Sequence, residues 1–182
     1  RKNDHFVFAS SPDRGVNRLL ALWPKIREEL PEATLEILYG WRGCEKLGIV
    51  SGGSLWRARL ARERGQFDAT VNQPGVMCRG LVNHWEVANA FQRAGVWAYP
   101  TDFAETGCLT AAKARAGGAV PVCPPLAALP ETAASALTQC TPDVSNDEAF
   151  VEACVNATKF TDDERRNMSY ESIEQHDIEA FN

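Results

Sequence analysis

The sequence has no apolar run near the roughly 18 residues that a membrane-spanning helix needs. Its first residues, Arg1-Lys2-Asn3-Asp4-His5, also lack the apolar core of a signal peptide. We therefore expect neither insertion nor export, and we predict a cytoplasmic protein that is either free or peripheral at a membrane. Because the chain begins with Arg1 rather than Met, we interpret it as part of a longer polypeptide.

The sequence also has fewer positively than negatively charged residues. The 182 residues carry 19 Lys and Arg against 24 Asp and Glu, a formal net charge of −5. Such a chain lacks the broad positive field with which nucleic-acid-binding proteins neutralise phosphates, so general DNA or RNA binding is disfavoured. The length and the 45% hydrophobic content favour one globular domain over residues 1–182, and no repeat or second domain boundary is visible.

The six cysteines lack the close spacing of zinc sites. They stand at Cys44, Cys78, Cys108, Cys123, Cys140 and Cys154. A chain of this length can build its own core without covalent staples. We therefore predict free thiols in a reducing compartment rather than a disulfide framework, and no metal or cofactor.

Short apolar runs alternate with stretches of helical periodicity over most of the chain. The predicted strands are 6–10, 34–39, 76–79, 96–99 and 119–123. The predicted helices between them are 16–26, 55–64, 87–94 and 106–116. Because a helix is the usual crossover between parallel strands, we predict an α/β fold: a Rossmann-like, doubly wound parallel sheet of five or six strands with helices on both faces.

Local signals refine the helices. Asp13 is placed to cap the first helix, and Pro24 is expected to kink or restart it. The helix over 55–64 carries four arginines, at Arg57, Arg59, Arg62 and Arg64. A solvated face alongside Glu63 is the favoured interpretation, and a phosphate or an anionic membrane is the alternative ligand.

The tail over 145–182 is predicted to be helical. Segments 145–148 and 161–164 both match the capping-box pattern, in which a Ser or Thr and a Glu satisfy each other's orphan amides. They predict helices over 145–157 and 161–171, and a third helix is expected over 173–181.

The loop after the fourth predicted strand is the most informative. In open parallel sheets, ligands bind beyond the carboxyl ends of the strands, where the strand order reverses. Glu105 there precedes a predicted helix start with Gly107 in its first turn, and such a start can hold a phosphate. Arg14, in the loop after the first strand, would add a guanidinium. Alternatively, Glu105 only caps a helix, Gly107 only permits close packing, and Arg14 only pairs with Asp13.

Two motifs occupy these loops. They are Ser10-Ser11-Pro12-Asp13-Arg14-Gly15 and Glu105-Thr106-Gly107-Cys108-Leu109-Thr110. With the surrounding runs 6–41 and 99–122, and with 80–86 and 128–131, they resemble the C-terminal, donor-binding half of a retaining, group-1 type glycosyltransferase of the GT-B fold, which has two Rossmann domains.

The resemblance implies a role for each matching residue. Glu105 would be the catalytic residue that faces the donor sugar. The donor diphosphate would contact Ser10, Ser11, Arg14, Gly15, Thr106, Gly107, Cys108 and Leu109. The nucleoside would contact Arg79, Gly80, Leu81 and Lys113. Amides and a guanidinium would stabilise the departing diphosphate without a metal.

The resemblance also implies partners. The donor would be a nucleotide sugar linked to UDP or GDP, and the acceptor a sugar or glycoconjugate. The acceptor would bind an N-terminal domain of the same polypeptide that this chain does not contain, so the isolated domain is expected to be inactive. The alternatives are a non-catalytic Rossmann-like module and one half of a nucleotide-sugar epimerase.

The roles of three residues, Lys113, His84 and Cys108, each allow more than one interpretation. Lys113 stands where the family pattern has a second Glu, and it has no acceptor for ribose hydroxyls. Either the nucleotide is held differently, or Lys113 meets a phosphate, or donor binding is weakened. For His84, a capping or exposed position is favoured over a catalytic or base-contacting one. For Cys108, a role through its amide is favoured over a reactive thiolate.

Overall fold

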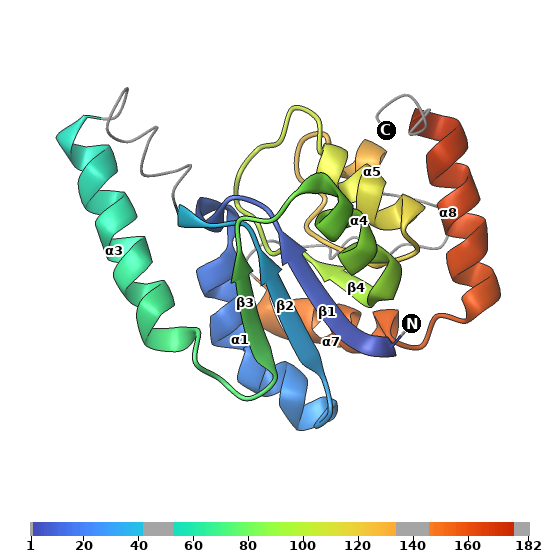
Figure 1. Ribbon diagram of the computed structural model, residues 1–182, viewed down its shortest axis with the longest axis horizontal. Helices are drawn as coiled ribbons and strands as arrows, with labels where there is room; N and C mark the ends of the chain where they lie inside the picture. Colours follow the sequence, from blue (N-terminus) through green and yellow to red (C-terminus); the bar gives the residue numbers. More distant parts are fainter. Residues whose placement is uncertain (1, 42–52, 134–145, 177–182) are drawn as a thin grey trace.

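The architecture is built on one parallel β-sheet. The computed structural model describes residues 2–41, 53–133 and 146–176. Its five strands are all parallel and lie in the order β3-β2-β1-β4-β5 (Figure 1). They are β1 (Lys2–Ala9), β2 (Thr34–Leu38), β3 (Val76–Gly80), β4 (Ala94–Ala98) and β5 (Val120–Val122). The α/β prediction is confirmed.

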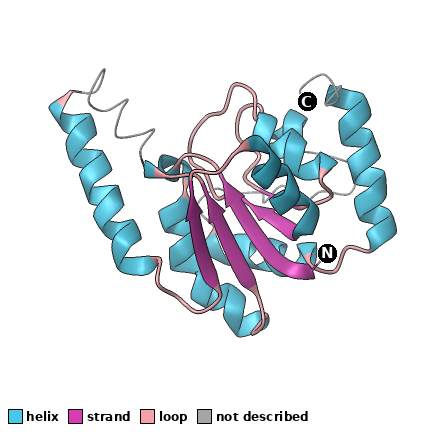
Figure 2. Cartoon of the chain, in the orientation of Figure 1, coloured by secondary structure: helices cyan, strands magenta, loops and turns pink. Residues whose placement is uncertain are grey.

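Helices cover both faces of this sheet (Figure 2). They are α1 (Val16–Glu29), α3 (Ser54–Thr70), α4 (His84–Arg93), α5 (Leu109–Ala116), α6 (Leu129–Ala133), α7 (Asp147–Ala157) and α8 (Asp162–His176), with a short 3-10 turn η1 (Pro12–Arg14) before α1. Helices α1 and α7 lie behind the sheet in Figure 1, and α4 and α5 lie in front of it. This two-sided covering explains why every residue of β4 is buried.

The buried face of α1 follows from its sequence. Val16, Leu19, Leu20, Trp23 and Ile26 recur at helical spacing, and all are buried. The Trp23 ring packs edge-on against Phe6 of β1, with 5.5 Å between the ring centroids. The predicted periodicity is therefore confirmed where the first helix meets the first strand.

The first helix differs from the prediction at two residues. Its N-cap is Gly15, and Asp13 lies in η1 instead. Pro24 lies inside α1 and does not restart it, since the helix is continuous from Val16 to Glu29. Proline has no N–H to donate to the carbonyl four residues earlier. Here the Gln73 side chain donates to that carbonyl, the one of Leu20, at 2.9 Å.

The tail is helical, as predicted, with one corrected cap. The side chain of Asn146 caps α7 by accepting from Ala149 N at 2.9 Å, whereas Ser145 lies outside the described residues. The capping box of Thr161 and Glu164 is confirmed. Helix α8 runs through to 176, so it includes the start of the predicted third helix; the rest of that helix lies outside the described residues.

Three further expectations concern the cysteines, the arginines of α3 and membrane-spanning helices. Cys78, Cys108 and Cys154 are free thiols within the part of the chain that the structure describes, while Cys44 and Cys140 lie outside it. The four arginines of α3 are solvent-exposed, as expected for a solvated face, and Arg59 pairs with Glu63. Within the described ranges, no helix is long and apolar enough to span a membrane.

Candidate functional site

The loops after β1 and β4 touch at the point where the strand order reverses. Gly15, with φ of 104°, sits between η1 and α1 in a left-handed conformation that favours glycine. A Cβ atom at Gly15 would lie 2.5 Å from the carbonyl oxygen of Pro100. A side chain is therefore excluded on both grounds, and glycine allows the two loops to lie against each other.

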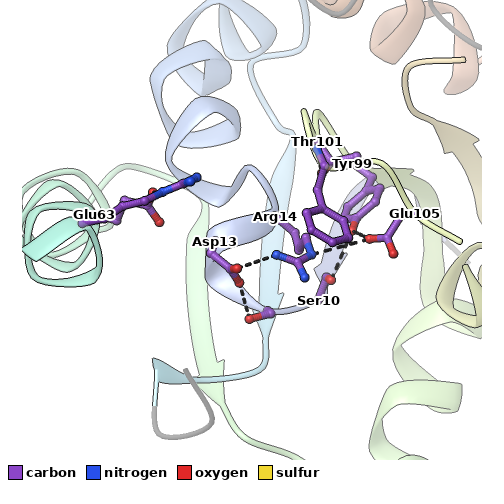
Figure 3. A network of polar contacts seen from close by, with 10 residues as sticks. Ser10, Asp13, Arg14, Glu63, Tyr99, Thr101 and Glu105 are labelled. Carbon is purple, nitrogen blue, oxygen red and sulfur yellow. Dashed lines mark hydrogen bonds and ion pairs between the residues drawn. The ribbon is translucent and has the colours of Figure 1, made fainter. Parts of the chain in front are cut away.

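This contact brings the predicted diphosphate-binding and catalytic residues together. Nε of Arg14 lies 3.7 Å from Oε1 of Glu105, and the Arg14 guanidinium carbon lies 3.5 Å from the centre of the Phe103 ring. Nη1 of Arg14 also donates to Asp13, which accepts from the hydroxyl of Ser11 as well. The predicted pairing of Arg14 with Asp13 is thus present, and so is its proximity to Glu105 (Figure 3).

Tyr99, the residue directly after β4, also belongs to this network. Its hydroxyl donates to Oε1 of Glu105 at 2.6 Å and lies 3.4 Å from Oγ of Ser10. The Tyr99 ring is buried and stacks on Trp97, with centroids 4.7 Å apart. Burial, with a further contribution from the Glu105 hydrogen bond, raises the pKa of Tyr99 well above its usual range. The phenol therefore remains a hydrogen-bond donor.

The second motif is arranged differently from the prediction. Helix α5 begins at Leu109 with Cys108 as its N-cap, so Thr106 and Gly107 precede the helix. A Cβ atom at Gly107 would meet nothing within 4 Å. The proposal that Gly107 only permits close packing is therefore wrong, because the space above it is open. Glu105 does not cap α5: the N-cap is Cys108, no side-chain cap hydrogen bond is present among the described residues, and the Glu105 carboxylate accepts from Tyr99.

The surroundings of Cys108 and His84 do not favour a catalytic role for either side chain. Cys108 is 6% exposed, and burial raises the pKa of its thiol to about 11. A reactive thiolate is thus disfavoured, and the Cys108 amide remains the group of interest. His84 is exposed at the first residue of α4, where the capping box is formed by Asn83 and Glu86.

The structure brings only some of the residues that were predicted to contact the nucleoside into one cleft. Gly80 and Leu81 line an apolar cleft of about 280 Å³ that also contains Tyr39 and reaches Ser10 of the polar network. Arg79 lies elsewhere: it contacts Glu36 at 3.2 Å and Glu86 at 3.6 Å, and it lines a different cavity. Lys113 lies on α5, four residues after Leu109 and hence on the same helix face.

Sequence reasoning missed three aromatic residues of this site. Tyr99 was interpreted only as the end of a strand, although a tyrosine that closes a buried strand carries its hydroxyl to the ligand-binding edge of the sheet. Phe103 lies in the second loop and supports Arg14. Tyr39 has a φ of 99°, which is unusual for a residue with a side chain; sequence pattern carries no signal for that conformation.

No protein-family model matches the chain, and no curated protein resembles it in sequence. Solved structures do resemble it in fold. The pneumococcal O-GlcNAc transferase GtfA, in complex with UDP and GlcNAc, is 14% identical with a TM-score of 0.57, over 96% of this chain and 32% of that one. The GtfA/B complex gives 18% identity and a TM-score of 0.64, over 97% and 33%.

A third structure is a mutant of S. aureus TarM in complex with fondaparinux, α-GlcNAc-glycerol and UDP. It is 8% identical with a TM-score of 0.68, over 100% of this chain and 33% of that chain. This chain thus spans about a third of the length of each of these proteins. At such low identity the likeness concerns the fold alone, that of a Rossmann-like domain.

Proposed function

We propose that this chain is the donor-binding domain of a retaining, metal-independent glycosyltransferase, with a UDP- or GDP-linked sugar as donor. The observation that carries the proposal is the position of Arg14 and Glu105. They lie 3.7 Å apart where the order of a 3-2-1-4-5 sheet reverses, which is the usual ligand position in such sheets.

The diphosphate would lie between the two loops. Nη2 of Arg14 has no hydrogen bond to the part of the chain that the structure describes, so it is available to a phosphate oxygen. The space over Gly107 is open, and two residues further on the Leu109 amide begins α5. As the first amide of the helix, it has no partner inside the helix and would be offered to a phosphate. Ser10, Ser11, Gly15, Thr106 and Cys108 complete this surface.

These groups suit a leaving nucleoside diphosphate. Negative charge accumulates on that group as the bond to the sugar breaks, and fixed donors that already point at it lower the barrier. A guanidinium and helix-terminal amides supply such donors without a metal ion. Glu105, held by Tyr99, would face the sugar at the other end of the same surface.

The nucleoside would occupy the apolar cleft beside the network. Tyr39, Trp41 and Leu81 line that cleft, and Ser10 belongs to both the cleft and the network. Flat apolar walls with a polar edge suit a nucleobase and its ribose. Gly80 would contribute backbone contacts, and Lys113 would approach the phosphates rather than the ribose, since it has only donors.

The acceptor would bind an N-terminal domain of the same polypeptide, outside the 182 residues of this chain. GtfA and TarM were solved with UDP, and this supports UDP as the first nucleotide to test. We place residues 1–182 in one donor domain that lacks transfer activity by itself. The acceptor would be a sugar or glycoconjugate.

Calorimetry on this chain tests the donor role. UDP, GDP and ADP are titrated into the wild type, Arg14→Ala and a matched control, Arg166→Ala, whose side chain is exposed on α8. We expect one nucleotide to bind, with an affinity at least about tenfold lower in Arg14→Ala because a charge-assisted contact is lost, and unchanged in Arg166→Ala. Absence of binding at millimolar concentrations of all three nucleotides would refute the donor role.

A second experiment addresses catalysis. In the full-length protein, Glu105→Gln should abolish sugar transfer while leaving UDP affinity near that of the wild type. Transfer that survives this change would contradict a catalytic Glu105 and favour a non-catalytic module. Product analysis without acceptor separates the remaining alternative, because an epimerised donor would indicate an epimerase.

A further inference from the structure

A second and larger cavity lies beside the candidate donor site. Its volume is about 490 Å³, which is within the range of small-molecule sites. Asp13 and Pro100, from the two loops described above, form one wall, and Glu63 of α3 lies in another. Neither Arg14 nor Glu105 is among its lining residues, but Asp13, which pairs with Arg14, belongs to both the lining and the polar network. The cavity therefore adjoins the network without containing Arg14 or Glu105.

The charged groups of this cavity are mostly paired with one another. Nη2 and Nε of Arg18 both donate to Oδ1 of Asp147, at 2.8 and 3.0 Å. Nε of Arg59 donates to Oε1 of Glu63 at 2.7 Å. Each pair therefore presents carboxylate acceptors and guanidinium donors side by side.

Arg59 also faces carboxylates from the opposite wall. The hydrogen bond to Glu63, followed by the charges of Asp102 and Asp13, raises the pKa of Arg59. The Arg59 guanidinium of α3 is therefore attracted electrostatically to the carboxylates of Asp13 and Asp102, which also line the cavity. Among the residues that the structure describes, the lining has four carboxylates, those of Asp13, Asp102, Glu63 and Asp147, and two guanidiniums, those of Arg18 and Arg59.

This arrangement selects the chemistry of a ligand. An anion such as a phosphate would face an excess of carboxylates. A cation would compete with Arg18, Arg59 and Arg14, which already pair with Asp147, Glu63 and Asp13. A hydroxyl group is both donor and acceptor, so it can bridge a carboxylate and the neighbouring guanidinium without breaking the pair. A neutral ligand with many hydroxyls matches the lining best.

The lining also includes two amide side chains. Nδ2 of Asn17 donates to the carbonyl of Glu63 at 2.9 Å, and its Oδ1 is buried, so that oxygen does not itself reach a ligand. Gln66 of α3 is exposed. Its amide both donates and accepts, which suits a hydroxyl-rich ligand.

We propose that this cavity binds a neutral saccharide. The binding itself does not depend on the donor role. Only the further step, that the saccharide is part of the acceptor and lies beside the donor because Asp13 and Pro100 border both sites, rests on the proposed function.

Saturation-transfer NMR on this chain tests the proposal, with maltose, lactose and N,N′-diacetylchitobiose as neutral probes and glucose 6-phosphate as the anionic one. Gln66→Trp places a large ring in the cavity mouth from an exposed helical position. Its matched control is Ala61→Trp, an exposed position of α3 that does not line the cavity. Thermal unfolding of both variants verifies the fold.

We expect at least one neutral disaccharide to receive saturation from the wild type and from Ala61→Trp. The signal should fall at least about tenfold in Gln66→Trp, and glucose 6-phosphate should give none. Absence of transfer to all three neutral probes, or equal transfer in Gln66→Trp, would overturn the site.

UDP binding, measured on the same samples, keeps the two proposals apart. Saccharide binding that persists in Arg14→Ala, or in a chain that binds no nucleotide, supports this cavity as a separate site. Saccharide binding that disappears in Arg14→Ala but persists in Gln66→Trp would place the sugar in the donor site and overturn the present inference.

Discussion

The hydroxyl of Tyr99 donates a 2.6 Å hydrogen bond to Oε1 of Glu105. The tyrosine ring is 1% exposed and stacks on Trp97 of β4, so it cannot turn away from this contact. Glu105 itself lies in a loop, where side chains ordinarily have more freedom. The buried core therefore sets the direction of the one carboxylate that we assign to the donor sugar.

Tyr99→Phe should separate sugar recognition from nucleotide recognition. Loss of the hydroxyl removes a charge-assisted hydrogen bond but leaves the ring stacking intact. We expect affinity for a UDP-sugar to fall about fivefold, or ~1 kcal/mol, and affinity for UDP to stay unchanged, as measured by calorimetry. Tyr170→Phe, at an exposed position of α8, is the control. An equal loss for UDP and UDP-sugar would contradict this role for Tyr99.

Gly15→Ala should destabilise the fold. The alanine would have to adopt a φ of 104° with its Cβ 2.5 Å from the Pro100 carbonyl oxygen, so both backbone strain and steric overlap oppose it. We expect the free energy of unfolding to fall by at least about 2 kcal/mol, as measured by urea denaturation. A variant as stable as the wild type would show that the two loops do not need this close approach.

Gly107→Ala is expected to behave in the opposite way. The added methyl group meets no protein atom within 4 Å, so stability should stay within about 0.5 kcal/mol of the wild type. Nucleotide affinity should nevertheless fall, because a donor diphosphate would lie in the space that the methyl group enters. Unfolding and calorimetry on the same preparation test both parts, and unchanged UDP affinity would move the diphosphate away from Gly107.

Arg165→Met should destabilise the fold, because Arg165 anchors α8 to neighbouring elements. Arg165 of α8 is fully buried, and its guanidinium donates to the carbonyls of Gly95, Gly118 and Ala157. Methionine would leave these acceptors without donors, so we expect a loss of about 3 kcal/mol or more in unfolding free energy. The neighbouring Arg166→Met, at an exposed position, should change it by less than about 0.5 kcal/mol. Equal effects would refute the anchoring role.

Alkaline pH should weaken the fold through Cys108. Burial raises the pKa of this thiol from its usual 9.0 to about 11, so the unfolded chain ionises first. The stabilisation is complete below pH 9 and is lost as pH rises toward about 11. Cys108→Ala should therefore lose about 1–2 kcal/mol less stability than the wild type between pH 8 and about 10.5, whereas exposed Cys78→Ala should match the wild type. Identical losses in all three proteins would contradict the prediction.

Much of the fold was predictable because its signals are local. The apolar runs identified each strand, and helices between them implied parallel crossovers. Once the sheet was taken as open and doubly wound, the loops that carry Arg14 and Glu105 had to lie at the same edge. Their adjacency follows from β1 and β4 being neighbours in the sheet.

Other features depended on contacts between distant segments. Pro24 predicts a kink or a restart, yet α1 is continuous across it. Gln73, far along the chain, supplies the Leu20 carbonyl with the donor that proline lacks. Sequence pattern predicts a helix start at Thr106, whereas α5 begins at Leu109. The backbone angles of the loop decide where a helix is capped, and sequence pattern does not specify those angles.

The sequence by itself determined the order of strands and helices and the presence of Arg14 and Glu105 in facing loops, since hydrophobic periodicity and turn residues act over short distances. Only the tertiary structure decided that Tyr99 holds Glu105 and that Arg79 turns toward Glu36. It also formed the cavity between α3 and the two loops. Such features arise where side chains remote in sequence are packed together, and composition and spacing carry no record of those distances.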